Sequence, residues 1–140
     1  MNMLLDVALL LQSKSIGTFE QDIFLSGFPD FDSVPDDAIA LFDYAGLPVD
    51  NADSDFRQLS MQVCTRSTGY TSALERAEVV SAALKDIGNT VKELPHIVLN
   101  NTIYFKFAAL QHPFKLREDD KGRIYFAQNF RVQAKPISKL

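Results

Sequence analysis

Cysteine and histidine, which many metal and catalytic sites use, are almost absent from this sequence. The chain has one cysteine, Cys64, and two histidines, His96 and His112, in 140 residues. A single cysteine excludes a disulfide within the chain and any multi-cysteine zinc site. Each histidine adjoins a proline, a context that favours loop edges over the paired positions of a metal-binding motif. The sequence therefore predicts no metal site.

Sequence motifs of catalysis and cofactor binding are also missing. There is no glycine-rich phosphate loop and no dinucleotide-binding fingerprint. The aspartate-containing runs 30–32 and 50–53 lack the glycine and the final glutamate of a calcium loop. Cys64 and His96 could be written as nucleophile and base, but no catalytic signature surrounds Cys64, and its strand-like setting predicts a small buried thiol. We expect no enzyme activity and no cofactor.

No hydrophobic run is long enough to cross a membrane. The most apolar segment, 1–11, is interrupted by Asp6 and has neither a basic leader nor a small-residue cleavage site, so we expect no targeting signal. Its apolar residues recur at helical spacing, which predicts an amphipathic helix over 2–14. We favour a helix of the protein core, with a membrane-binding or partner-binding helix as the alternative.

The bulk composition is that of one folded domain. A chain of 140 residues with 46% hydrophobic and 23% charged residues is large enough for a core and too small for two domains. Eleven phenylalanines and no tryptophan make Phe the main bulky side chain of that core. The net charge of −4 argues against general nucleic-acid binding, which usually needs a basic patch.

Hydrophobic periodicity places the remaining elements. Runs rich in β-favouring residues, several with period-two alternation, predict strands at 18–25, 38–43, 57–66, 97–107 and 124–134. The run 97–107 is expected to be one long strand interrupted only by Asn101. A second amphipathic helix is predicted over 70–87, and Gly88 ends it. Acidic loops at 26–37 and 50–55, a connector at 91–95 and a charged turn within 111–122 separate these elements.

This order of elements predicts an α+β fold that forms a single domain over residues 1–140. Strands joined by loops, with the helices segregated, favour a mainly antiparallel sheet. Each helix has one apolar stripe, and Leu59, Met61 and Val63 offer an apolar strand face to receive it. We therefore expect both helices to pack side by side on one face of the sheet.

Charge is divided unevenly along the chain. Residues 1–105 hold 6 basic and 15 acidic side chains, a net of −9, whereas residues 106–140 hold 8 basic and 3 acidic ones, a net of +5. Opposed charges on one small chain favour head-to-tail contact between copies. The alternative, left open by the sequence, is that they neutralise each other within one fold.

Three consecutive segments carry a resemblance to a known family. They are AIALFDYAGLPVD at 38–50, RQLSMQVCTRS at 57–67 and GYTSALERAEVVSAAL at 69–84. This succession resembles the small tail-terminator and minor-capsid proteins of long-tailed bacteriophages. The resemblance implies a structural virion protein, made in the host cytoplasm, that forms a ring at the head–tail junction, typically of six copies. Alternatives are another phage neck or minor capsid protein, or a small non-phage binding domain.

The resemblance also implies partners. Such a ring stops polymerisation of the tail-tube protein and offers a docking surface to the head connector or head-completion protein. DNA passes through its lumen without sequence-specific binding, and no membrane is involved. The acidic loops are candidates for lining the lumen, where aspartates would repel phosphates, or for an outer docking surface.

The candidate interface residues are Arg123, Arg131 and Lys135. The last predicted strand, 124–134, is expected at an edge of the sheet, where a neighbouring copy could pair with its backbone. The three cationic side chains would then meet acidic groups of the adjacent copy. The alternative, also left open by the sequence, is that this strand completes the chain's own sheet and that its charges are only solvated.

Overall fold

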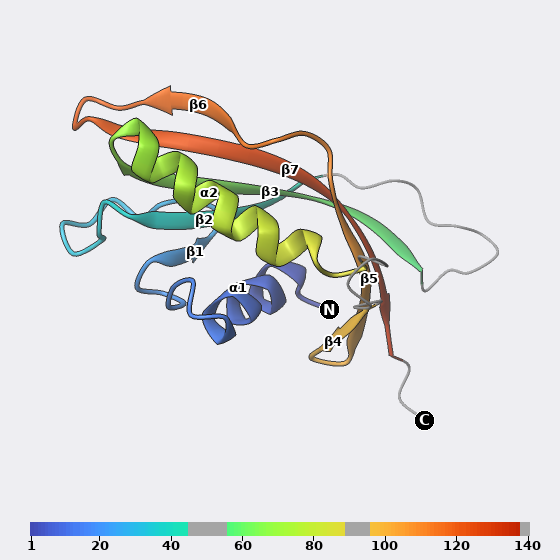
Figure 1. Cartoon of the computed structure of the whole chain (residues 1–140). Coiled ribbons are helices and arrows are strands. Elements are labelled where there is room, and N and C mark those ends of the chain that lie inside the picture. The colour runs from blue at the N-terminus through green and yellow to red at the C-terminus, as the bar shows by residue number, and fades with distance from the viewer. Residues whose placement is uncertain (45–55, 89–95, 138–140) are drawn as a thin grey trace.

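The structure is a computed structural model that describes residues 1–44, 56–88 and 96–137. The predicted acidic loop 50–55 and connector 91–95 lie outside these residues. In chain order the elements are α1 (Met3–Ser13), β1 (Ile23–Leu25), β2 (Ala38–Tyr44), β3 (Arg57–Thr68), α2 (Tyr70–Lys85), β4 (Ile97–Leu99), β5 (Thr102–Ala109), β6 (Phe114–Glu118) and β7 (Arg123–Pro136) (Figure 1). The chain is therefore α+β, as the sequence predicts.

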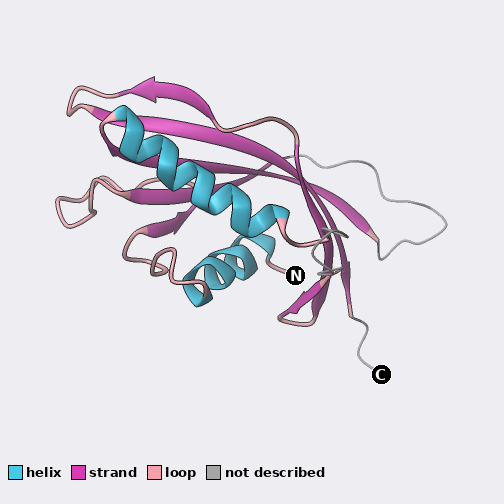
Figure 2. Ribbon diagram, in the orientation of Figure 1, coloured by secondary structure: helices cyan, strands magenta, loops and turns pink. Residues whose placement is uncertain are grey.

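One sheet contains all seven of these strands (Figure 2). The strand order is β1-β2-β3-β7-β5-β4, and β6 pairs with β7 beside β5. Among the pairings of the described strands, β1 with β2 is parallel and the other five are antiparallel, so the sheet is mainly antiparallel. The two longest strands, β3 and β7, pair along most of their length and form its centre.

The predicted position of the last strand at a sheet edge is wrong. β7 pairs with β3 along one side, while on its other side β6 pairs with its first half and β5 with its second half. Residues 124–128 are buried on both faces, which is typical of an interior strand. The Gln111 side chain spans the place where the partner changes, because its Oε1 accepts a hydrogen bond from the Asn129 backbone N–H at 3.0 Å. A strand of 14 residues is long enough for two short partners on one side.

The predicted single strand over 97–107 is also wrong. It is a hairpin of β4 and β5, joined by Asn100 and Asn101. Both asparagines have positive φ, 47° and 62°, as a two-residue hairpin turn requires. Asn is one of the few non-glycine residues that adopt this conformation readily. The alternating apolar pattern continues across the turn in the sequence and conceals it.

Two further predictions differ from the structure. Of the predicted strand 18–25 only Ile23–Leu25 is a strand, because the Asp22 side chain accepts a hydrogen bond from the Thr18 backbone N–H at 2.6 Å and closes a turn. The predicted charged turn within 111–122 contains β6, whose five residues are all exposed. Phe114 to Arg117 alternate between apolar and polar residues, but the run is short, lies between a proline and a charged segment, and buries neither face.

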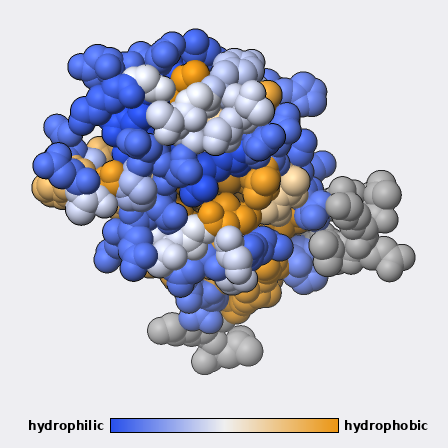
Figure 3. All heavy atoms as spheres, turned by 60° about the vertical axis from the view of Figure 1, so that its left-hand side comes forward, coloured by the Kyte–Doolittle hydropathy of each residue, from blue (hydrophilic) through white to orange (hydrophobic). Residues whose placement is uncertain are grey.

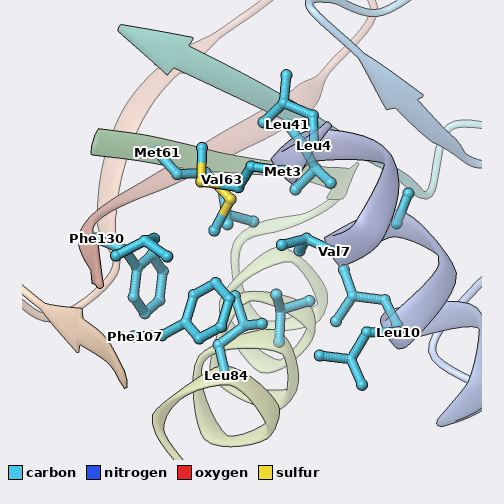
Figure 4. Close-up of a cluster of buried hydrophobic side chains, with 14 of the residues drawn as sticks. Met3, Leu4, Val7, Leu10, Leu41, Met61, Val63, Leu84, Phe107 and Phe130 are labelled. Carbon is cyan, nitrogen blue, oxygen red and sulfur yellow. The ribbon is translucent and has the colours of Figure 1, made fainter. Parts of the chain in front are cut away.

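Side chains from both helices meet the sheet in one hydrophobic core cluster (Figure 4). Val7 and Leu11 of α1 and Leu84 of α2 are completely buried in it, with Met61 of β3 and Phe130 of β7. Met61 and Phe130 are register partners, and partners across an antiparallel pair share one face of the sheet. Both helices therefore contact this face, which we call the helix face.

A buried polar network links α1 to the β4–β5 hairpin. The Asp6 side chain is 2% exposed and accepts hydrogen bonds from Asn100 Nδ2 at 2.9 Å and from the Tyr104 hydroxyl. Burial, together with the hydrogen bond to Asp6 and its negative charge, raises the pKa of Tyr104 well above its usual value. The network fixes the start of α1 over the hairpin.

Candidate interaction surface

The face of the sheet opposite the helix face collects basic residues. Strand residues on this open face alternate with the core residues, and cross-strand register identifies them. Six of the 14 basic residues of the chain lie there: Arg66, Lys106, Arg117, Arg123, Arg131 and Lys135. Among the strand residues that the structure describes, none on this face is acidic. Such a concentration of one sign of charge favours an anionic partner.

Two of these cations, Arg66 and Arg123, contact loop 26–37, which we call the acidic loop, and Arg117 lines a cleft together with it. Arg66 is 3% exposed and donates from Nε to the Asp36 carbonyl at 3.2 Å and from Nη2 to the Pro35 carbonyl at 3.0 Å. Its guanidinium carbon lies 4.6 Å from the centroid of the Phe28 ring. The loop thus covers one end of the open face with both aromatic and acceptor groups.

The guanidinium of Arg123 is bound by carboxylates of its own chain. Its Nε donates to Asp119 Oδ2 at 2.7 Å, and its Nη1 lies 3.8 Å from Asp36 Oδ1. Tyr125 also donates to Asp119, and the Arg117 guanidinium carbon lies 3.8 Å from the centroid of the Tyr125 ring. The ion pair with Asp36 joins the two oppositely charged parts of the sequence within one fold, at this end of the sheet.

Asp119 is the anion that organises this cluster. Burial by itself would raise the pKa of its carboxyl group, but hydrogen bonds from the Arg123 side chain and backbone, the Tyr125 hydroxyl and the Lys121 backbone hold that pKa well below its usual range. The acidic loop and these strand ends enclose a cleft of about 450 Å³ lined by charges of both signs. Basic side chains are in slight excess in this lining, which contains Asp30, Asp32, Asp36, Arg66, Arg117, Lys121 and Arg123.

The low pKa of Asp119 predicts a pH dependence of stability. A carboxyl whose pKa is lowered by folding stabilises the fold above its unfolded value, about 3.9, and loses that contribution as the pH falls below it. We expect Asp119→Asn to lower the free energy of unfolding at pH 7 and pH 5, and the difference from wild type to shrink between pH 4 and pH 2. Urea unfolding at these pH values measures it. Asp120→Asn, at an exposed neighbour, is the control, and equal effects of the two variants would contradict the prediction.

The other cations of the open face, Lys106, Arg131 and Lys135, form a separate group on β5 and β7. Lys106 pairs in register with Gln133, which stands between Arg131 and Lys135 on the same face of β7. Lys106 and Arg131 are exposed, and neither has an ion-pair partner within the described part of the chain. We call Lys106 and Arg131 the cationic patch.

Of the three candidate interface residues, Arg131 and Lys135 lie on one face of the second half of β7 with Gln133 between them, and Arg123 is at the opposite end of the strand. Sequence reasoning missed Lys106, although its strand was partly predicted. Its place beside Arg131 depends on the bulge between Tyr104 and Lys106, which shifts the register of β5. No local pattern in the sequence reports that shift.

Cys64 lies in β3 and His96 immediately before β4, and β7 and β5 stand between these two strands in the sheet. Cys64 is buried at the centre of the sheet, paired with Ala40 and Ala127, as predicted. Burial raises the pKa of its thiol to about 11, despite the nearby charges of Arg117 and Arg66, so the thiol is protonated at neutral pH. His96 is exposed beside Phe105.

The described residues contain neither a metal-binding cluster nor a membrane-spanning helix. No group of three or more His, Cys, Asp or Glu side chains in 1–44, 56–88 and 96–137 is arranged to hold a metal ion. In the same ranges, neither helix has the length and apolarity that a membrane span needs.

Comparison with known proteins links the chain to phage tails. A family model described as bacteriophage tail terminator protein matches residues 10–136. Among solved structures, a chain from the virion of a native gene transfer agent particle has the same fold, with a TM-score of 0.62 and 15% sequence identity, over 95% of this chain and 94% of that one. No individually curated protein matches the sequence.

Proposed function

This chain belongs to the bacteriophage tail terminator family, and we propose that it is a structural virion protein that ends the growth of a phage tail tube. Identical copies close into a ring, of six subunits, on the last layer of tail-tube protein. The ring presents a docking surface to the head connector or head-completion protein at the head–tail junction. DNA passes through its lumen without sequence-specific contacts, and the protein catalyses no reaction.

The family match over 10–136 carries this proposal, and the uneven charge of the surface supports the ring. A ring of identical subunits needs two different, complementary surfaces on each copy. Arg131 and Lys135 supply a cationic surface that meets acidic groups of the adjacent copy. Arg123 contributes only the donors that Asp119 and Asp36 leave available, because its Nε is bonded to Asp119 and its Nη1 lies near Asp36 within the chain.

Reversing Arg131 and Lys135 to glutamate should convert rings into monomers. The double change replaces attraction between copies with repulsion, and we expect association to weaken at least tenfold while the circular dichroism spectrum stays unchanged. Native mass spectrometry over a range of salt concentrations measures the change, and rings of the wild-type chain should weaken as salt screens the contact.

A matched control tests whether net charge alone is responsible. Lys85→Glu with Lys115→Glu makes the same change in charge at two exposed lysines on the helix-covered side, and rings should persist. If the variant with Arg131 and Lys135 changed to glutamate still forms rings that are insensitive to salt, this interface is wrong. A wild-type chain that stays monomeric, both alone and on tail tubes, would reject the ring itself.

A further inference from the structure

The acidic loop carries an exposed aromatic side chain between two aspartates. Phe31 is 72% exposed, more than any other large hydrophobic residue in the described part of the chain. Asp30 and Asp32 beside it are exposed as well, and the Val34 N–H donates to the Phe31 carbonyl at 3.0 Å, which turns the chain at this point. A single exposed apolar residue is common. Its position between two anions makes this tip a match for a cationic surface.

We propose that the tip Asp30-Phe31-Asp32 of one copy binds the cationic patch, Lys106 and Arg131, of a second copy. This inference rests on the proposed function, because it identifies the contact that joins successive subunits of the ring. The aspartates pair with the two cations, and the Phe31 ring stacks on the Arg131 guanidinium.

The patch has the shape and charge for this tip. Arg131 pairs in register with Ala108, whose small side chain leaves space beside the guanidinium for an aromatic ring. Lys106 lies diagonally across from Arg131 on the adjacent strand, a spacing at which like charges repel each other. Two carboxylates placed on this pair would remove the repulsion.

The acidic loop already makes the same kind of contact inside its own chain. Phe28, at the start of the loop, lies against the Arg66 guanidinium on the open face. Asp36, at the end of the loop, lies against Arg123. An aromatic ring and a carboxylate of this loop therefore already bind cations of this face, and the tip extends the same chemistry to another copy.

The contact lies between copies because the two surfaces are at opposite ends of the molecule. In Figure 1 the loop between β1 and β2 is at the left, whereas β5 and the end of β7 are at the right. Arg123, which contacts the loop, and Arg131 are eight positions apart on β7, roughly 26 Å at 3.3 Å per residue. Figure 3 turns the left end forward and shows a mostly hydrophilic surface with hydrophobic residues gathered in patches. A tip at one end and a patch at the other give a head-to-tail contact, which can close into a ring.

A charge exchange between two variants tests the contact. The tip-reversed variant carries Asp30→Lys and Asp32→Lys, and the patch-reversed variant carries Lys106→Glu and Arg131→Glu. Each alone should fail to form rings, with association weakened at least tenfold by native mass spectrometry. An equimolar mixture should form rings in which the two alternate, because each reversed surface then meets its complement. Phe31→Ala should also weaken association, without a change of charge.

Controls separate this contact from other causes. Glu75→Lys with Glu78→Lys makes the charge change of the tip-reversed variant at two exposed residues of α2, and rings should remain. If tip-reversed chains form normal rings, and reversal of Arg131 and Lys135 still abolishes rings, then the tip contact is wrong and the proposed function stands. If the wild-type chain forms no rings under any condition, both the tip contact and the proposed function are wrong. Binding of the chains to a random-sequence DNA duplex is measured by fluorescence anisotropy. If patch-reversed chains form rings but lose this DNA binding, the patch is a DNA contact and the inference is wrong.

Discussion

Leu84→Ala should lower the free energy of unfolding by about 2–5 kcal/mol, since truncation of a buried leucine removes apolar contacts and leaves a cavity. Leu84 is completely buried in the core cluster that joins α2 to α1 and to the sheet. Urea unfolding followed by circular dichroism measures the loss, which should also lower the melting temperature by several degrees.

Two controls on the same helix define what the Leu84 result means. Leu74 is only partly buried, against a smaller cluster, so Leu74→Ala should cost less. Val79 is 54% exposed, and Val79→Ala should change stability by less than about 0.5 kcal/mol. A loss below about 0.5 kcal/mol for Leu84→Ala would mean that this side of α2 does not belong to the core.

Asp6→Ala should cost roughly 2–4 kcal/mol, because it removes the acceptor of two hydrogen bonds in a buried network. The Tyr104 hydroxyl and the Asn100 amide would then lack the partner that Asp6 provides. Tyr104→Phe should cost less, about 1–2 kcal/mol, because Asp6 keeps its bond from Asn100. Urea unfolding of both single variants measures these losses.

A double-mutant cycle shows whether the two residues act together. Asp6→Ala combined with Tyr104→Phe should cost less than the sum of the single changes, because the phenylalanine has no hydroxyl to leave unsatisfied. Strictly additive losses would show that the hydrogen bond between Asp6 and Tyr104 contributes little. Hydrogen exchange should also become faster in the β4–β5 hairpin of Asp6→Ala, since α1 is bonded to it through this network.

The stability variants and the interface variants address separate parts of the molecule. Leu84 and Asp6 are buried on the helix side of the sheet, whereas Phe31 and Arg131 are exposed. Changes of the first kind should lower stability and changes of the second kind should alter assembly at unchanged stability. A variant of Arg131 that unfolded the monomer would show that this side chain serves the fold instead of a contact between copies.

Local sequence patterns are enough to locate several elements of this fold. Helices predicted at 2–14 and 70–87 are found at Met3–Ser13 and Tyr70–Lys85, because one-sided apolar spacing is a property of consecutive residues. The strands predicted at 38–43 and 57–66 are found with similar bounds for the same reason. The lack of catalytic motifs and the uneven division of charge along the chain are also properties of the amino-acid sequence alone.

Contacts between residues that are distant in the sequence set how these elements meet. The place of β7 inside the sheet and the hairpin at Asn100 depend on pairing between residues distant in sequence, which local periodicity does not encode. The register of β5 on β7 also places Lys106 diagonally across from Arg131. A sequence fixes how many charges a chain carries, whereas strand pairing and a single bulge fix which of them share a surface, because side chains gather only where the backbone hydrogen bonds place them.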